Sequence, residues 1–195
     1  MARPKEFDRE AAVAAAMQVF WAKGYEAAST EELLGAMGIG RQSMYDTFGD
    51  KQSLYLEALR RYHRDNGAAA GHVVGDAASP LEGIKATLLA LAERDAAEQA
   101  RGCMGINATT AFGRVLPDIR NLASATASVV EAAFERAVRA AQAQHELAAS
   151  LDAKAAAQFL YANLQGLTVR AQAGAPRQAL RNAARFAIEA LTNMH

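Results

Sequence analysis

Two short helical segments joined by a glycine turn constrain this chain more than any other feature of its sequence. Residues 29–37 open with Ser29 and Glu32 at the spacing of a capping box, in which each side chain accepts a hydrogen bond from the other residue's backbone N–H. Gly38 suits the left-handed position that ends a helix. Residues 41–47 predict a second short helix that turns hydrogen-bonding side chains outward, namely Arg41, Gln42, Ser43 and Thr47. A helix-turn-helix of this size fits the DNA major groove, so the segment predicts DNA binding.

The composition predicts an all-helical protein. Of the 195 residues, 51% are hydrophobic and four are prolines, and a chain rich in alanine and poor in proline favours closely packed helices. No apolar run reaches the roughly 18 residues that a membrane-spanning helix needs, and the N-terminus lacks the apolar core of a signal peptide. The single cysteine, Cys103, cannot form an internal disulfide, which fits a reducing compartment. We therefore expect an all-α protein of the cytoplasm.

The charge of the N-terminal segment is unusual for a DNA-binding module. Residues 1–51 contain six lysines and arginines against eight acidic residues, whereas nucleic-acid-binding domains are commonly basic. Positive charge must therefore be placed locally, by Arg3 and Lys5 in the N-terminal arm and by Arg41 and Lys51 around the predicted turn. We expect weak non-specific binding to DNA, because phosphate neutralisation supplies most of it.

Hydrophobic periodicity and capping residues predict about nine helices. Several of them start at a recognisable cap, such as Asp50, Asp152, or Ser79 followed by Pro80. The predicted segments are residues 8–22, 29–37, 41–47, 50–66, 79–96, 102–112, 118–147, 152–172 and 177–192. A glycine- and alanine-rich stretch, residues 67–79, is the expected connection between an N-terminal module and a C-terminal bundle.

An ordered set of aromatic residues and glycines resembles the N-terminal domain of TetR-family transcriptional regulators over residues 8–60. It consists of Phe20, Gly24-Tyr25, Ser29-Thr30, Leu33, Gly38-Ile39, Ser43-Met44-Tyr45, Phe48, Lys51 and Leu54. The resemblance implies a three-helix DNA-binding domain at residues 1–50 and an effector-binding and dimerisation domain at residues 51–195. It also implies that the last two helices pair in a homodimer and that the middle helices enclose a ligand pocket.

The resemblance makes Arg41 to Thr47 the recognition helix. It places Thr30, Tyr45 and Lys51 at positions that contact DNA phosphates. The residue types support base contacts by the first two side chains, since arginine pairs bidentately with guanine and glutamine with adenine. The full predicted DNA-binding set is Arg3, Thr30, Arg41, Gln42, Ser43, Tyr45, Thr47 and Lys51. Gly40 departs from the family, which usually has serine or threonine there, so a hydroxyl that could reach a phosphate is absent.

Two neighbouring residues of this segment, Tyr45 and Asp46, have structural alternatives. Tyr45 either packs in the core near Phe48 or contacts a phosphate, and the resemblance favours the phosphate contact. Asp46 either accepts a hydrogen bond from a cytosine or supports the recognition helix, and the supporting role is favoured because phosphates repel its charge. Phe20, Tyr25 and Phe48 are expected in the core.

Candidate ligand-binding residues lie on the segment that follows Arg101. Cys103 stands beside this arginine near a helix start, a setting that favours the reactive thiolate, and the segment resembles the pocket helix of TetR-family regulators that sense electrophiles. A free cysteine more often packs as a small hydrophobic residue, and that role is favoured here. Further candidates on this segment are Met104, Asn107, Thr109, Thr110 and Phe112, and two more, Asn163 and Gln165, lie on the predicted helix 152–172. These side chains either line a pocket or pack with their hydrogen bonds satisfied.

The sequence gives no support for catalysis. The four histidines, His63, His72, His145 and His195, lack the spacing of metal ligands. We find no nucleophile with a partner base, no phosphate-binding glycine loop and no suggestive pair of carboxylates. We therefore expect no enzyme activity, no metal and no cofactor.

These features predict a homodimeric, ligand-responsive repressor that binds a palindromic DNA operator and is released by a small molecule. Two alternatives remain open at this point. One is a DNA-binding regulator without a small-molecule effector, which would have a solid bundle core. The other is an all-helical binding protein or enzyme whose N-terminal module no longer reads DNA, which the near-neutral charge of that module favours.

Overall fold

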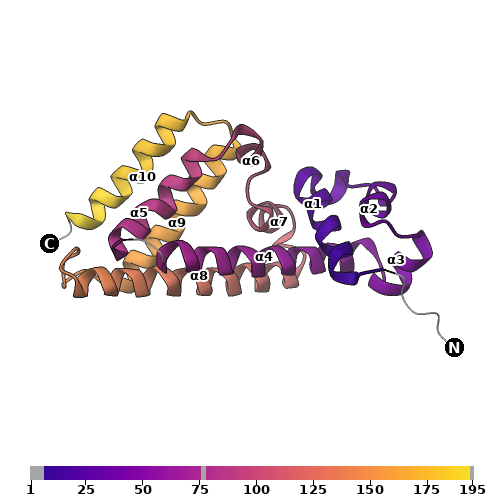
Figure 1. The fold of residues 1–195 in the computed structure, drawn as a ribbon, viewed down its shortest axis with the longest axis horizontal. Coiled ribbons are helices and arrows are strands. Elements are labelled where there is room, and N and C mark those ends of the chain that lie inside the picture. Colours follow the sequence, from indigo (N-terminus) through magenta and orange to yellow (C-terminus); the bar gives the residue numbers. More distant parts are fainter. Residues whose placement is uncertain (1–6, 76–77, 194–195) are drawn as a thin grey trace.

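Ten helices make up the part of the chain that the structure describes (Figure 1). The computed structural model describes residues 7–75 and 78–193, with the backbone alone for residues 67–75. Helices and loops, without strands, form these residues, so the predicted all-α fold is confirmed. The helix that the sequence did not predict is α6 (Ala96–Arg101), which begins with a capping box between Asp95 and Glu98.

The first three helices are α1 (Arg9–Ala27), α2 (Thr30–Met37) and α3 (Arg41–Phe48). Gly24 interrupts α1 with φ 77° and ψ 171°, so the regular helix ends at the predicted point and one further turn leads to α2. The three helices enclose a shared core whose most buried large side chains are Phe20, Leu33 and Met44. Tyr25 is half-buried and stacks on Phe20, with 6.3 Å between the ring centroids.

The turn between α2 and α3 forms as its sequence predicts. The capping box of Ser29 and Glu32 is complete at the start of α2. Gly38 ends α2 in the left-handed conformation, at φ 65° and ψ 29°. Gly40 is the N-cap of α3 and supplies no side-chain hydrogen bond. The orientation of α3 therefore depends on this backbone turn and on the burial of Met44 and Phe48 beneath it.

Helix α4 (Lys51–Gly75) joins the N-terminal helices to the rest of the molecule. Asp50 caps it by accepting a hydrogen bond from Ser53 N at 2.6 Å. The expected connection at residues 67–79 is wrong as far as residue 75, because α4 continues through it. Alanine has the highest helix propensity, and the glycines of this stretch lower helix stability by only about 1 kcal/mol each.

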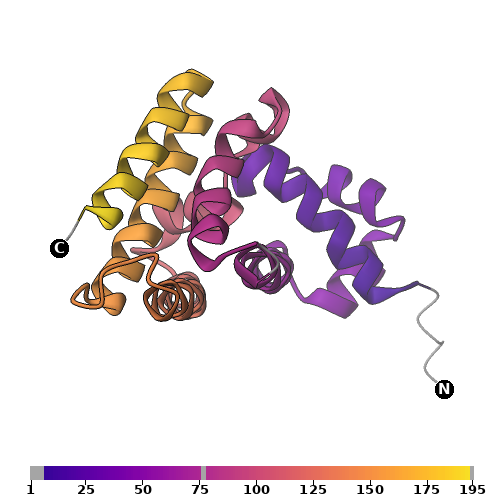
Figure 2. The same cartoon turned by 60° about the vertical axis from the view of Figure 1, so that its left-hand side comes forward.

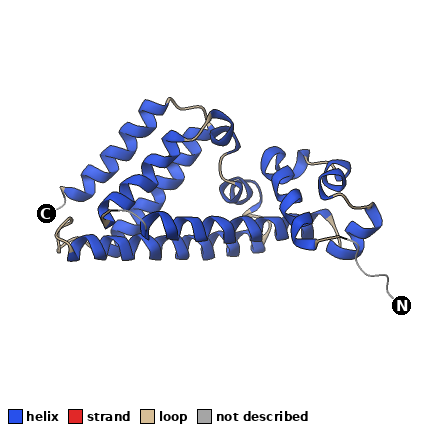
Figure 3. Ribbon diagram, viewed as in Figure 1, coloured by secondary structure: helices blue, strands red, loops and turns tan. Residues whose placement is uncertain are grey.

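The remaining helices form a bundle. They are α5 (Pro80–Glu93), α7 (Met104–Phe112), α8 (Pro117–Ala143), α9 (Ala153–Gln172) and α10 (Arg177–Thr192), besides α6. In Figures 1 and 2, α4 and α8 lie alongside each other, and α9 and α10 form a pair at the end far from α2 and α3. Figure 3 shows the same view by secondary structure.

The bundle core consists mainly of side chains from α5, α8, α9 and α10. Its fully buried members include Ile84, Phe134, Leu160 and Leu180. The N-terminal core is larger than the three-helix module, since Met104, Ala108 and Ile119 of α7 and α8 belong to it. No helix within residues 7–75 and 78–193 is long and apolar enough to cross a membrane.

We expect opposite effects from two alanine substitutions in the helix-turn-helix. Gly38→Ala should lower the free energy of unfolding by about 1–2 kcal/mol, because a Cβ is unfavourable at its left-handed φ. Gly35→Ala is the matched control within α2. It should raise stability by about 0.5–1 kcal/mol, because the site is helical and open. Urea unfolding measures both, and equal shifts in one direction would contradict the assigned turn.

Candidate nucleic-acid interface and ligand cavity

Helix α3 presents a polar face opposite its buried one. Met44 and Phe48 point into the core, whereas Arg41, Gln42, Tyr45 and Asp46 are exposed. Tyr45 is 43% exposed although it is aromatic. Ser43 and Thr47 are half-buried at the edges of this face. The six side chains together form a short outward ridge that can enter a groove of DNA.

Acidic neighbours hold two side chains of this ridge. Arg41 forms an ion pair with Glu31 of α2, and the pKa of Glu31 is lowered by a backbone hydrogen bond and by Arg41. Gln42 donates to Asp46 Oδ1 at 2.8 Å, which fits the supporting role favoured for Asp46. Exposed ion pairs contribute only about 0–1 kcal/mol. A phosphate or a base edge can therefore displace Glu31 at little cost.

The remaining predicted DNA-binding residues flank the ridge. Thr30 opens α2 and is half-buried, and Lys51 opens α4. The Lys51 ammonium lies 4.6 Å from the ring centroid of Tyr25, which orients it by a cation–π contact. Burial, followed by the charges of Glu26 and Asp50, raises the pKa of Tyr25. Arg3 lies outside the described residues.

Helix α1 is attached to the junction between α6 and α7. Trp21 Nε1 donates to the carbonyl oxygen of Gly102 at 3.0 Å. The guanidinium of Arg101 stacks over the Trp21 ring at 4.0 Å and donates to Gln18 Oε1 at 2.6 Å. Gly102 has φ +62°, and the side chain of Gln172 from α9 occupies the space that a Cβ would need. Only glycine fits this crossing of three helices.

A cavity of about 360 Å³ lies immediately behind this junction. Its walls come from α4, α5, α7, α8 and α9, so it lies between the middle helices of the chain and opens to solvent on one side. Apolar side chains such as Leu91, Ile106, Val130 and Leu164 alternate there with hydroxyl, amide and imidazole groups. This mixture is typical of a site for a small organic molecule.

The structure places only some of the candidate ligand-binding residues in the cavity wall. Cys103, Thr109, Thr110 and Gln165 line it, and Cys103 is half-buried. Four other candidates lie elsewhere, which corrects the expectation for Met104, Asn107, Phe112 and Asn163.

Each of these four side chains has a different local role. Met104 is buried in the N-terminal core, and Phe112 packs on the rings of Tyr25 and Tyr55. Asn107 and Asn163 donate to the carbonyl oxygens of Arg101 and Phe159. The helical period puts these residues on faces that the sequence alone did not distinguish.

Residues of α4 are among the cavity groups that sequence reasoning missed. Tyr62 and His63 line the cavity, and His63 Nδ1 lies 2.7 Å from Thr126 Oγ1 of α8. Gly105 allows this arrangement, because a Cβ there would lie 2.7 Å from His63 Cε1. The signal in the sequence was two residues with polar groups in succession, Tyr62 and His63, within an amphipathic helix.

Burial shifts the titration of the cavity groups towards their neutral forms. It lowers the pKa of His63 and raises the pKa values of Tyr62 and Tyr161. Nearby Tyr55, in the N-terminal core, has a pKa raised to about 12 by the same cause. No cluster of three or more metal-ligating side chains occurs within the described parts of the chain.

Comparisons with known proteins agree with this geometry. Residues 12–58 match the family model described as bacterial regulatory proteins, tetR family, and residues 80–187 match the tetracyclin repressor-like C-terminal domain. The chain is 32% identical to the HTH-type transcriptional repressor ComR of Escherichia coli over 91% of this chain and 86% of ComR. It is also 32% identical to YezE of Bacillus subtilis, an uncharacterized HTH-type transcriptional regulator, over 93% of this chain and 95% of YezE.

A solved structure extends the similarity to a DNA complex. A cysteine mutant of the TetR family transcriptional regulator CifR, complexed with operator DNA, has a TM-score of 0.77 and 32% identity, over 96% of this chain and 99% of that one. The chain therefore belongs to the TetR family of transcriptional regulators, and its helix-turn-helix is a DNA-binding module.

The half-buried His63 predicts a specific dependence of stability on pH. Because its pKa is lower in the folded protein than in the unfolded chain, the unfolded chain binds the proton more readily below about pH 6.5. The folded state should therefore be destabilised as the pH falls through this value. His63→Asn keeps a hydrogen-bonding group near Thr126 and cannot titrate, so it should lose less stability on acidification. Urea unfolding from about pH 7.5 to about pH 5.5 tests this, and a variant-to-wild-type difference that is constant with pH would contradict it.

Proposed function

We propose that this TetR-family chain is a homodimeric repressor that a small molecule releases from a palindromic operator. The observation that carries this proposal is that one helix, α4, belongs both to the core of the DNA-binding module and to the wall of the cavity. A ligand in the cavity touches the helix that positions α1 to α3. The protein would act in the cytoplasm, where DNA and metabolites are both accessible.

The DNA-binding role is assigned to the ridge on α3 and the residues that flank it. Arg41 and Gln42 stand at the start of the helix, where side chains reach base edges. Ser43 and Thr47 extend the readout, and Tyr45 joins Thr30, Lys51 and Arg3 in contacting phosphates. CifR in complex with its operator supports this role for a similar fold, and ComR, also 32% identical, is named a repressor.

Dimerisation is assigned to the outer faces of α9 and α10. Three large apolar side chains are exposed there, namely Phe159 at 42%, Val169 at 48% and Phe186 at 74%. Exposed apolar side chains gathered on paired helices mark an interface between proteins. A second copy of the chain would place two α3 helices at a fixed separation, and about 34–36 Å matches successive major grooves of DNA.

Release would follow from a population shift between two separations of the DNA-binding modules. A ligand acts on the equilibrium only if it binds one form more tightly than the other. Two connections link the cavity to the module: α4 itself, and the hydrogen bond from Trp21 to Gly102, whose neighbour Cys103 lines the cavity. A change in the cavity wall therefore moves α1 and α4 together.

Arg41→Ala should weaken binding to the operator by about 1–3 kcal/mol and relax the preference at one base position. The loss of its ion pair with Glu31 contributes little, since both side chains are exposed. The operator is first selected from a random DNA library, and fluorescence anisotropy then measures the affinity. Arg136→Ala, an exposed arginine on α8, is the matched control. Equal affinities for Arg41→Ala and the control would rule out the assigned contact.

Phe186→Glu should weaken the dimer at least about tenfold, because it puts a charge into an apolar interface. Operator affinity should fall with it, since both half-sites need an α3 helix. Val115→Glu is a matched control, because Val115 is equally exposed at 74% but lies between α7 and α8. Sedimentation equilibrium measures the dimer. Unchanged association of Phe186→Glu would show that another face pairs the subunits.

A further inference from the structure

One charged side chain stands out in the described wall of the cavity. Arg94 lines it from the turn after α5, and no carboxylate is among the described residues that line it. Arg94 is also exposed, so its guanidinium lies where the cavity meets solvent. It is shared with a smaller adjoining cleft that includes Leu91, Glu98 and Thr168.

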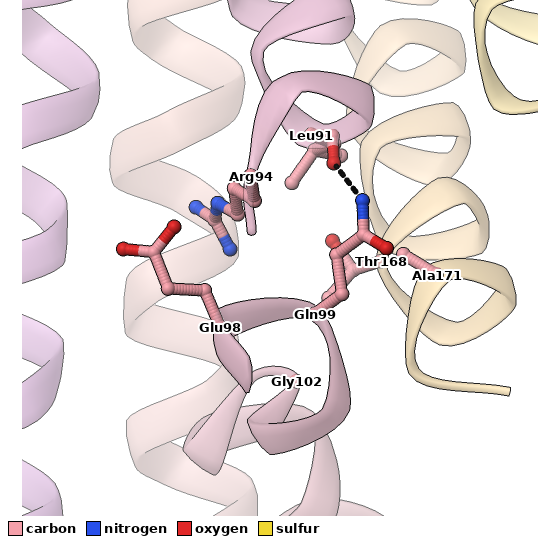
Figure 4. Close-up of a pocket in the computed structure, with 7 residues that line it drawn as sticks. All are labelled: Leu91, Arg94, Glu98, Gln99, Gly102, Thr168 and Ala171. Carbon is pink, nitrogen blue, oxygen red and sulfur yellow. Dashed lines mark hydrogen bonds between the residues drawn. The ribbon is translucent and has the colours of Figure 1, made fainter. Parts of the chain in front are cut away.

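The guanidinium of Arg94 is available to a ligand. Figure 4 shows Arg94 and Glu98 extending to the same side of the α5–α6 turn. Within residues 7–75 and 78–193, however, the two form no ion pair, and Arg94 has no other acidic partner. A carboxylate oxygen of Glu98 instead lies 3.4 Å from the backbone N of Asp95 in the capping box of α6. Glu131 also lies near the cavity, where its charge, after burial and Cys103, contributes to raising the pKa of Tyr161.

The turn that carries Arg94 is held by α10. Arg177 donates to the carbonyl oxygen of Arg94 at 3.1 Å. Arg181 forms two hydrogen bonds of 2.8 Å to the carboxylate of Glu93, one residue earlier. These contacts fix the backbone at the base of the Arg94 side chain, so that binding an anion requires ordering of the side chain alone.

The rest of the cavity suits an uncharged body. Burial lowers the pKa of His63 and raises the pKa values of Tyr62 and Tyr161, so it favours the neutral forms of these hydrogen-bonding groups. Leu91, Ile106, Val130 and Leu164 supply apolar surface around them. A ligand with a second charge would be desolvated in this interior without a partner.

We propose that the effector is a small amphipathic organic anion, whose carboxylate or similar head pairs with Arg94 and whose apolar or aromatic body occupies the cavity. This inference rests on the proposed effector role of the cavity. Arginine suits such a head because its planar donors match a carboxylate or sulfonate in two parallel hydrogen bonds. The same arginine lies on a turn held by the dimerisation helix α10, so the ligand head would contact the segment between the cavity and the subunit interface.

Two fluorescent dyes of similar shape test the inference with the full-length dimer. Anilinonaphthalene sulfonate carries an anionic head, and phenylnaphthylamine has the same aromatic body without it. Arg94→Gln should weaken binding of the sulfonate dye by about tenfold and leave binding of the neutral dye unchanged. Arg94→Lys should recover part of the affinity, because it keeps the charge and loses the planar fork. Arg114→Gln removes an exposed arginine that does not line the cavity, and should change neither dye.

A neighbouring substitution gives an effect of opposite sign. Glu98→Gln preserves the capping box of α6, because glutamine can replace glutamate there, and removes a negative charge beside Arg94. The sulfonate dye should therefore bind more tightly, by about two- to threefold, and the neutral dye should not respond.

Ala123→Leu separates failure of this inference from failure of the proposed function. It fills part of the cavity from α8 and should weaken both dyes. Suppose that Ala123→Leu weakens binding of both dyes, whereas Arg94→Gln weakens both equally or neither. The proposed pairing of an anionic head with Arg94 is then wrong, and the cavity remains the ligand site. If Ala123→Leu leaves both dyes unaffected, the cavity is not the site of binding, and the effector role falls together with the inference.

Discussion

The packing of one continuous helix into two cores is the constraint on which the structure depends. Leu54 and Leu59 of α4 are fully buried among the side chains of α1 to α3. One turn further on, Tyr62 and His63 reach the cavity. A helix is stiff over this distance because each turn is hydrogen-bonded to the next. The proposed release of DNA therefore relies on α4 to carry a displacement at the cavity to the DNA-binding module.

The junction at Gly102 adds a second attachment at a different point of the module. Trp21 bonds to its carbonyl group, and Arg101 covers the indole ring. This attachment joins α1 directly to the α6–α7 junction, in addition to the packing of α4 against both parts of the molecule. The N-terminal core also joins the two parts, since Met104 and Ile119 from the bundle are buried in it. The module and the bundle are thus mechanically joined, although residue 50 divides them by proposed role.

The local signals in the sequence predicted the elements well and their contacts poorly. Capping residues and the conformation of Gly38 depend on neighbours in the chain, so they could be derived from spacing. The cavity wall depends on which faces of five helices meet, and Met104 and Phe112 belong to another core for that reason. Asn107 and Asn163 satisfy their amides within their own segments, which sequence cannot distinguish from pointing inward. The glycines after residue 66 looked like a linker, but α4 continues through them to Gly75, as the helix propensity of the alanines favours.

The near-neutral charge of the DNA-binding module has a structural counterpart in its ion pairs. Arg41 pairs with Glu31, Lys23 with Glu32, and Arg9 with Glu57, so several cations are already partnered before DNA arrives. Each exposed pair contributes little stability, but under our proposal the pair of Arg41 with Glu31 must be exchanged for a base contact on binding. Non-specific DNA, which offers phosphates alone, gains little from that exchange. In the proposed complex an operator adds base contacts by Arg41 and Gln42, so the Arg41–Glu31 pair, which weakens binding to all DNA, increases the ratio of specific to non-specific affinity.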